Sequence, residues 1–204
     1  MTEILWVLDA GHGGMIDGVY QTSGKRSPKW EDGKQLFEGE FNRDVVSRIE
    51  SMCIASGIPC VVLVPEQEDV SLSERVCRAK EINENSDIPV VYLSVHANAG
   101  GGTGWEVFTS PGQTKSDLIA TVFAKHAAKL FPEFRMRTDK SDGDVDKESK
   151  FYVLVKTPMP AILTENFFMD TEYPDCRLLL TDHGRERIAK LHFNAMLEIQ
   201  QKGY

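Results

Sequence analysis

The chain has no long apolar run, and its basic residues are outnumbered by acidic ones. Of its 204 residues, 41% are hydrophobic and 26% are charged. No apolar segment approaches the roughly 20 residues of a membrane-spanning helix, so we expect no membrane span. The 23 lysines and arginines against 31 aspartates and glutamates give a formal net charge of −8. Because nucleic-acid-binding domains are usually basic, we expect no nucleic-acid partner.

Cysteine is also scarce, and no two cysteines are spaced as a C-x-x-C pair. The four are Cys53, Cys60, Cys77 and Cys176. Such spacing does not suit a cysteine metal site. Buried free thiols in a reducing compartment are the expected state.

The start of the chain lacks the features of a secretory signal. Residues 1–3 lead directly into an apolar run, without a basic segment, a long hydrophobic stretch or a small-residue cleavage site. We therefore expect either a protein that is cytoplasmic as synthesised, or an exported one whose signal has been removed.

Apolar runs typical of buried strands alternate with amphipathic segments of helical period. Strands are predicted at residues 4–8, 60–64, 88–95, 104–109, 151–155 and 160–163, and helices at 40–56, 72–82, 118–130 and 185–200. This order predicts an α/β fold: a single domain over residues 1–204, with a mostly parallel twisted sheet of about six strands and helices on both faces. A chain of this length can bury one sizeable core.

Two segments, residues 13–37 and 132–150, lack any such periodicity. Long loops in a compact domain are often functional, so we expect these two to form walls of a substrate groove. Solvated surface excursions are an equally good interpretation of most of their residues.

Polar residues stand where several of the predicted elements begin or end. His12 follows the first strand among three glycines, with Asp9 placed to orient it, and His96 ends a central strand. Glu165 ends the last strand. In parallel sheets, sites form beyond the carboxyl ends of the strands, where these three residues are expected to meet.

Two imidazoles and one carboxylate are typical of a catalytic zinc site with an open position. Glu40, at the start of the first predicted helix, is the candidate carboxylate, with Glu38 as its nearest competitor. The helix dipole alone could explain Glu40. Glu165 follows an apolar run, so burial should raise its pKa and make it a suitable proton acceptor near neutral pH.

Other motifs are interpreted as decoys. Asp142, Asp144 and Asp146 resemble the start of an EF-hand, but Lys147 replaces the glycine and Val153 the final glutamate. The glycines of residues 100–104 lack the lysine of a phosphate loop, so no nucleotide cofactor is expected. The remaining histidines are expected to be structural or exposed: His126, His183 and His192.

Together these motifs resemble the zinc-dependent N-acetylmuramoyl-L-alanine amidases of the amidase_3 type, found among bacterial autolysins and phage endolysins. The similarity covers essentially the whole chain, from residues 8–14 (Leu-Asp-Ala-Gly-His-Gly-Gly) to the last helix. It implies Zn²⁺ bound by His12, Glu40 and His96, with Glu165 as catalytic base and acid. The implied substrate is peptidoglycan, cleaved between N-acetylmuramic acid and L-alanine by one catalytic domain that no cell-wall-binding repeat follows.

One departure from the family pattern and two alternative functions remain. Asn166 stands where the family commonly has glycine, so the turn after Glu165 is uncertain. A zinc peptidase such as a metallocarboxypeptidase would usually have an H-x-x-E pair, which does not occur here in a ligand position. A murein-binding domain without turnover would be expected to have lost some of the four candidate residues.

Overall fold

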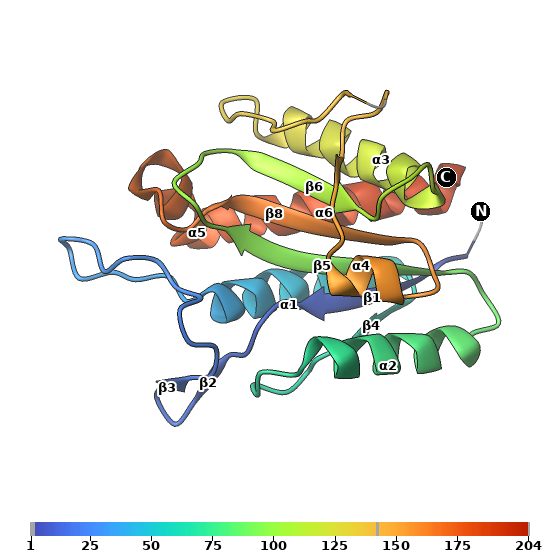
Figure 1. The fold of residues 1–204 in the computed structure, drawn as a ribbon, viewed down its shortest axis with the longest axis horizontal. Coiled ribbons are helices and arrows are strands. Elements are labelled where there is room, and N and C mark those ends of the chain that lie inside the picture. Colours follow the sequence, from blue (N-terminus) through green and yellow to red (C-terminus); the bar gives the residue numbers. More distant parts are fainter. Residues whose placement is uncertain (1–2, 142, 204) are drawn as a thin grey trace.

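The computed structural model describes residues 3–141 and 143–203. A six-stranded sheet with the order β4-β1-β5-β8-β6-β7 forms its centre, and a two-stranded ribbon, β2-β3, lies outside it (Figure 1). The main-sheet strands are β1 (Leu5–Ala10), β4 (Cys60–Val62), β5 (Val90–Asn98), β6 (Trp105–Thr109), β7 (Lys147–Glu148) and β8 (Ala161–Phe168). The ribbon strands are β2 (Met15–Ile16) and β3 (Val19–Tyr20).

The sheet is mostly parallel, as predicted. β1 pairs in parallel with β4 and β5, and β5 pairs in parallel with β8. The exception is β6, which runs antiparallel to β8. The carboxyl ends of β1, β5 and β8 therefore lie at one edge of the sheet.

Helices cover both faces of the sheet, which confirms the predicted α/β class. α1 and α3 each pack against α6 and against strands on one face, while α2 and α4 pack together on the other. The helices are α1 (Glu38–Ser56), α2 (Leu72–Glu84), α3 (Lys115–Leu130), α4 (Tyr152–Lys156), α5 (Arg177–Leu179) and α6 (Asp182–Lys202). An irregular helical turn, η1 (Glu172–Cys176), precedes α5.

Local sequence signals explain where two of the helices stop or start. Gly57 ends α1 in the left-handed conformation with φ 67°, which glycine adopts without steric cost. The Ser71 hydroxyl accepts a hydrogen bond from the Glu74 amide at the start of α2, as an N-cap should.

Side chains alternate between the two faces along each central strand. In β1, Trp6 and Leu8 enter the core beneath α1, α3 and α6, whereas Val7 enters the core beneath α2 and α4. In β5, Leu93 faces the first core and Tyr92 the second. Polar residues that follow Val7 and Tyr92 at every second position of their strands therefore point to the α2 face.

The predicted strand at residues 151–155 is wrong, because this segment forms α4. The adjacent Val153 and Leu154 are both buried, while Tyr152 and Val155 are 41% exposed. Adjacent buried residues suit one face of a helical turn and conflict with the alternation of a strand. The sixth strand of the sheet is instead β7, within the charged loop.

The two aperiodic segments contain short β elements. Residues 13–37 include β2 and β3, and residues 132–150 include β7. Asp142, part of the EF-hand-like pattern, lies outside the described residues. Among the described helices, none has the length and apolar character needed to cross a membrane.

His192 on α6 gives the fold a pH-dependent component. Its ring is fully buried between Thr164 Oγ1 at 2.9 Å and the Ile188 carbonyl at 2.8 Å. Burial lowers the pKa of His192 to about 4, below the value of about 6.5 expected in the unfolded chain. Stability from the neutral ring is complete above pH 6.5 and is lost as the pH falls toward 4, by roughly 2–3 kcal/mol.

We therefore expect the free energy of unfolding of His192→Gln to decline less steeply than that of wild type between pH 6.5 and 4. Urea unfolding of both proteins across this range measures the difference. Parallel pH profiles for the two proteins would contradict this role of His192.

Candidate active site

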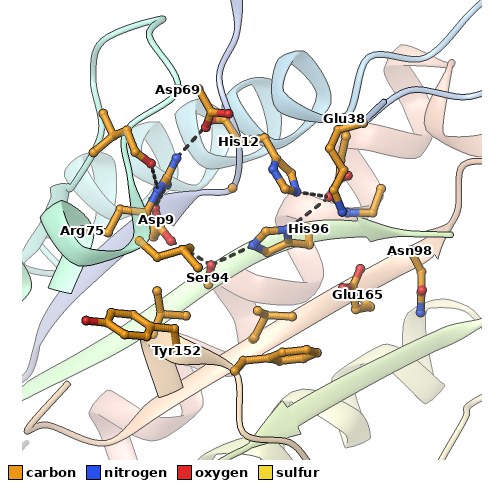
Figure 2. A pocket seen from close by; sticks show the side chains of 18 of the residues that line it. Asp9, His12, Glu38, Asp69, Arg75, Ser94, His96, Asn98, Tyr152 and Glu165 are labelled. Atoms are coloured by element: carbon orange, nitrogen blue, oxygen red, sulfur yellow. Dashed lines mark hydrogen bonds and ion pairs between the residues drawn. The ribbon is translucent and has the colours of Figure 1, made fainter. Parts of the chain in front are cut away.

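The polar residues predicted at the strand ends do meet at the carboxyl edge of the sheet (Figure 2). Asp9 of β1, Ser94 and His96 of β5, and Glu165 of β8 line one pocket. His96 and Glu165 are register partners on neighbouring strands. By alternation they share the face that Tyr92 and Leu163 occupy lower in the sheet.

His12 lies in a tight turn, and carbonyl groups of this turn accept hydrogen bonds from three side chains. Its backbone has φ 66°, a left-handed conformation that is uncommon for residues other than glycine. Arg43 and Arg75 donate to the His12 carbonyl at 2.7 and 3.2 Å, and Asn42 donates to the Gly11 carbonyl at 2.9 Å. These contacts hold the strained turn in place.

Glu38, the first residue of α1, joins the two histidines. Its Oε1 lies 3.2 Å from His12 Nε2 and 3.1 Å from His96 Nδ1. Burial alone would raise the pKa of the Glu38 carboxyl, but the two imidazoles outweigh it and keep this pKa well below its usual range. Burial lowers the pKa of His12, whereas the Glu38 and Glu165 charges outweigh burial and raise that of His96.

The structure places Glu38, and not Glu40, beside the two histidines. His12, Glu38 and His96 present possible ligand atoms within 4.8 Å of one another, and Glu40 is not in this group. Residues two positions apart on a helix face different directions, and the Glu40 carboxylate lies toward Gly14 instead. The signal missed in the sequence is the four-residue spacing of Glu38 and Asn42, which puts both on the helix face toward the His12 turn.

A hydrogen-bonded chain behind His96 sets the orientation of its ring. Ser94 Oγ donates to Asp9 Oδ2 at 2.8 Å and lies 3.1 Å from His96 Nε2. Because the hydroxyl proton is directed to Asp9, the serine oxygen accepts from Nε2–H of His96. Nδ1 is then the ring nitrogen that faces Glu38, and it becomes available to a metal ion once it has lost its proton.

Glu165 lies on the opposite side of the pocket from His12 (Figure 2). Its Oε2 is buried and makes no hydrogen bond within the described part of the chain. Burial raises the pKa of Glu165 to about 8; the Glu38 charge acts in the same direction, and His96 opposes it. The expectation of a desolvated carboxylate with a raised pKa is confirmed.

Asn166 stabilises the turn that follows Glu165. Its side chain accepts from Trp105 Nε1 at 2.9 Å and donates to the His96 carbonyl at 3.0 Å. The pairing of β5 with β8 shifts register just beyond His96, and Phe167 takes a positive φ of 64°. The left-handed residue is thus Phe167, while Asn166 bridges the strands across the irregularity.

Two glycines allow the backbones of the site to approach closely. A Cβ at Gly11 would stand 2.1 Å from the His96 ring, and a Cβ at Gly39 would stand 1.8 Å from the Gly13 carbonyl oxygen. Both separations are far shorter than van der Waals contact. Glycine at these positions therefore lets His96 and the start of α1 reach the His12 turn.

The pocket has a volume of about 630 Å³, and its rim is partly apolar. Leu72, Phe151 and Tyr152 are 55%, 38% and 41% exposed at its lining. From the first aperiodic loop Lys25 reaches the pocket, but none of the described residues between 132 and 150 does. The groove-wall prediction is thus supported for the first loop only, and α4 supplies the wall expected from the second.

This combination defines an α/β protein with a two-histidine, one-carboxylate centre and a second carboxylate across the pocket. The donor set is the one used by catalytic zinc sites. A family model described as "Amidase_3: N-acetylmuramoyl-L-alanine amidase" matches residues 7–198. The chain belongs to this family.

Relatives and solved structures agree with the assignment. A sporulation-specific N-acetylmuramoyl-L-alanine amidase of Bacillus subtilis (strain 168) is 27% identical over 93% of this chain and 65% of its own length. An endolysin of Bacillus phage SPP1 is 29% identical over 98% of this chain and 66% of its own length. The chain therefore spans slightly less than two thirds of these relatives.

Among solved structures, the amidase AmiC2 of Nostoc punctiforme has a TM-score of 0.74 at 22% identity, with 98% of each chain covered. The amidase Ami1 of Mycobacterium smegmatis has a TM-score of 0.75 at 20% identity, covering 98% of this chain and 97% of its own. These two structures share the fold.

The close approach at Gly39 predicts that alanine at this position lowers stability, which is the opposite of what helix propensity predicts. In an unconstrained helix interior, replacing glycine with alanine stabilises by about 1 kcal/mol. Gly39→Ala should instead destabilise the protein and displace Glu38 from His12, since the methyl group would overlap the Gly13 carbonyl. Chemical unfolding, together with NMR of the two histidine rings, measures both effects.

Ser47→Ala is the matched control, because Ser47 lies on the exposed side of the same helix. It should be neutral or slightly stabilising. Equal stabilisation by both substitutions would contradict the steric role of Gly39.

Proposed function

We propose that the chain hydrolyses the amide bond between N-acetylmuramic acid and L-alanine in peptidoglycan, using Zn²⁺. The observation that carries the proposal is the contact of one Glu38 oxygen with both His12 and His96, in a chain of the amidase family. The cell wall is the proposed place of action, as the names of the sporulation amidase and the phage endolysin suggest for those relatives.

The residues present fit a zinc ion. Glu38 Oε2 is buried without a hydrogen-bond partner among the described residues, so this carboxylate keeps an oxygen available. The Ser94–Asp9 chain directs Nδ1 of His96 toward the same point. We infer that His12, Glu38 and His96 hold the metal, with Glu38 replacing Glu40 as the third ligand.

Zinc, when bound, lowers the pKa of a coordinated water and polarises a carbonyl group. Glu165 accepts the proton of the attacking water, because burial raises the pKa of its carboxyl and so strengthens it as a base. A C–O bond forms at the lactyl carbonyl carbon as the C–N bond to alanine breaks. Glu165 returns the proton to the departing amine, so the products are a lactyl carboxylate and a free alanine amino group.

The pocket suits an amphiphilic chain such as a muramyl peptide. The apolar side chains of Leu72, Phe151 and Tyr152 offer surfaces for sugar rings and methyl groups. Lys25 in the lining offers a positive charge for a carboxylate of the stem peptide. Affinity for the wall then comes from this pocket, since the net charge of −8 does not favour an anionic polymer.

Metal content distinguishes Glu38 from Glu40. Glu38→Gln should weaken zinc binding at least about 100-fold, because loss of an outer-shell partner alone commonly costs 10- to 100-fold. Glu40→Gln, two residues away and chemically identical, should keep one zinc per chain. Competition with a chromophoric chelator, followed by elemental analysis, measures both variants.

A strong chelator should abolish turnover, and added zinc should restore it. Loss of zinc in Glu40→Gln with retention in Glu38→Gln would overturn the revised ligand assignment. Full turnover in metal-free protein would overturn the proposed zinc chemistry itself.

Removing the proposed base should separate catalysis from metal binding. Glu165→Gln should lower kcat by at least about 100-fold, since general acid–base catalysis commonly contributes 10²- to 10⁴-fold, while zinc content stays unchanged. Glu84→Gln, on the exposed surface of α2, is the control and should match wild type. Turnover of soluble muropeptides, with products identified by mass spectrometry, provides the measurement.

The products also test the reaction itself. New lactyl carboxyl groups and alanine amino termini support the amidase. Cleavage of another bond would indicate a zinc peptidase, and binding without any product would indicate a murein-binding domain. Near-wild-type turnover in Glu165→Gln would remove this residue from the mechanism.

A further inference from the structure

A second group of carboxylates lies outside the active-site pocket. Asp117, in the first turn of α3, meets Asp144 and Asp146 from the segment that leads into β7. One carboxylate oxygen from each lies within 4.8 Å of the others. Asp117 and Asp146 are buried, with exposed fractions of 7% and 2%.

Two oxygens of this group are buried without hydrogen-bond partners. The Asp117 carboxylate accepts from the Thr114 amide at 2.5 Å, which completes the cap of α3. Asp146 Oδ2 accepts from Thr109 Oγ1 at 2.6 Å. Asp146 Oδ1 and Asp144 Oδ1, however, have no hydrogen-bond partner in residues 3–141 and 143–203. A buried carboxylate oxygen is costly unless a proton, a donor or a cation satisfies it.

The proximity of like charges adds to this cost. Burial, reinforced by the neighbouring Asp144 and Asp117 carboxylates, raises the pKa of Asp146 to about 7. Near neutral pH the cluster must therefore hold a proton or bind a cation. One proton shared between Asp144 and Asp146 bridges two oxygens only, whereas a cation satisfies them together with the Asp117 carboxylate.

We propose that Asp117, Asp144 and Asp146 bind a hard divalent cation, Ca²⁺ by preference, at a site separate from the histidine centre. All three ligands are carboxylates, and oxygen-only donors suit Ca²⁺ and Mg²⁺ better than zinc. A hollow of about 440 Å³ adjoins the cluster, and its lining includes Thr114, Lys115, Asp117 and Asp144. It leaves room for the waters that complete the six to eight oxygen ligands of Ca²⁺.

The site is unrelated to an EF-hand, because one ligand comes from a helix distant in sequence. A cation here joins the start of α3 to the segment before β7. Lys147 follows directly, and its Nζ lies 2.5 Å from Glu106 Oε2 beside the active-site strand β8. Phe151 and Tyr152 of the pocket wall come a few residues later. Cation binding would therefore stabilise the chain that carries this wall.

The test uses the full chain, saturated with zinc and then titrated with Ca²⁺ by calorimetry. One Ca²⁺ per chain is expected, with a Kd on the order of 10⁻⁴–10⁻³ M, as in weak extracellular calcium modules. A concentration of 10 mM Ca²⁺ is about 100-fold above the lower of these two Kd values. At this concentration Tm should rise by roughly 3–10 °C. Absence of binding by Ca²⁺, Mg²⁺ and Mn²⁺ would overturn the proposal.

Asp144→Asn and Asp146→Asn should each weaken Ca²⁺ binding at least tenfold. Without Ca²⁺ neither should have a lower Tm than wild type, because each removes a repelling charge. Asp139→Asn is the matched control: it changes the same charge at an exposed position, where the carboxylate accepts from the Ser141 amide. If Asp146→Asn does not fold, the half-buried Asp144 provides the informative variant.

If Asp139→Asn and Asp144→Asn weaken Ca²⁺ binding equally, the change in net charge alone explains the loss. That result would overturn the proposed site. A Tm response that persists in Asp144→Asn but disappears in His96→Ala would locate the ion at the histidine centre and also overturn it. Neither result depends on whether the chain cleaves peptidoglycan.

Discussion

The buried ion pair of Asp9 and Arg75 is the interaction on which the site depends. Asp9 accepts from Tyr92 at 2.6 Å and from Ser94 at 2.8 Å, and Arg75 also donates to carbonyls of the His12 turn. The pair thereby links β1, β5 and α2, and through Ser94 it reaches the His96 ring. Removing one partner of such a pair leaves an uncompensated buried charge, which costs about 3–5 kcal/mol. The interactions that orient both histidines thus also contribute to the free energy of folding.

Around this pair, elements on opposite faces of the sheet contribute to one centre. α2 supplies Arg75 from one face, whereas α1 packs on the other face and reaches the carboxyl edge with its N-terminal residues 38–43. The glycine at position 39 permits that approach, and Glu38 is carried with it. Glu165 stays on the sheet, beside His96, where burial raises its pKa to about 8. His96 and Glu165 therefore lie on rigid strands. His12 lies in a turn, which is held in place by hydrogen bonds to its carbonyl groups.

Much of the fold was predictable because its signals are local. The β-rich runs that precede His12 and that end in His96 and Glu165 predicted three separate strands of a mostly parallel sheet, and helical periodicity with Gly57 and Ser71 predicted the helices between them. The prediction of a strand at residues 151–155 was wrong because five apolar residues suit a strand or a buried helical turn equally. Only packing against α2 and β8 decides in favour of the helix. The antiparallel direction of β6 likewise depends on the path of the chain around β8.

By itself, the sequence determined the fold class, the edge of the sheet where the pocket forms and three residues that meet there, His12, His96 and Glu165, because strand ends and glycines have local signatures. Only the tertiary structure places Glu38, and not Glu40, beside the two histidines, since both are glutamates in one helical turn and the rotation of the helix against the His12 turn separates them. It also brought Asp117 to Asp144 and Asp146 across a long sequence separation. Such meetings depend on packing between distant elements, which no local pattern of residues encodes.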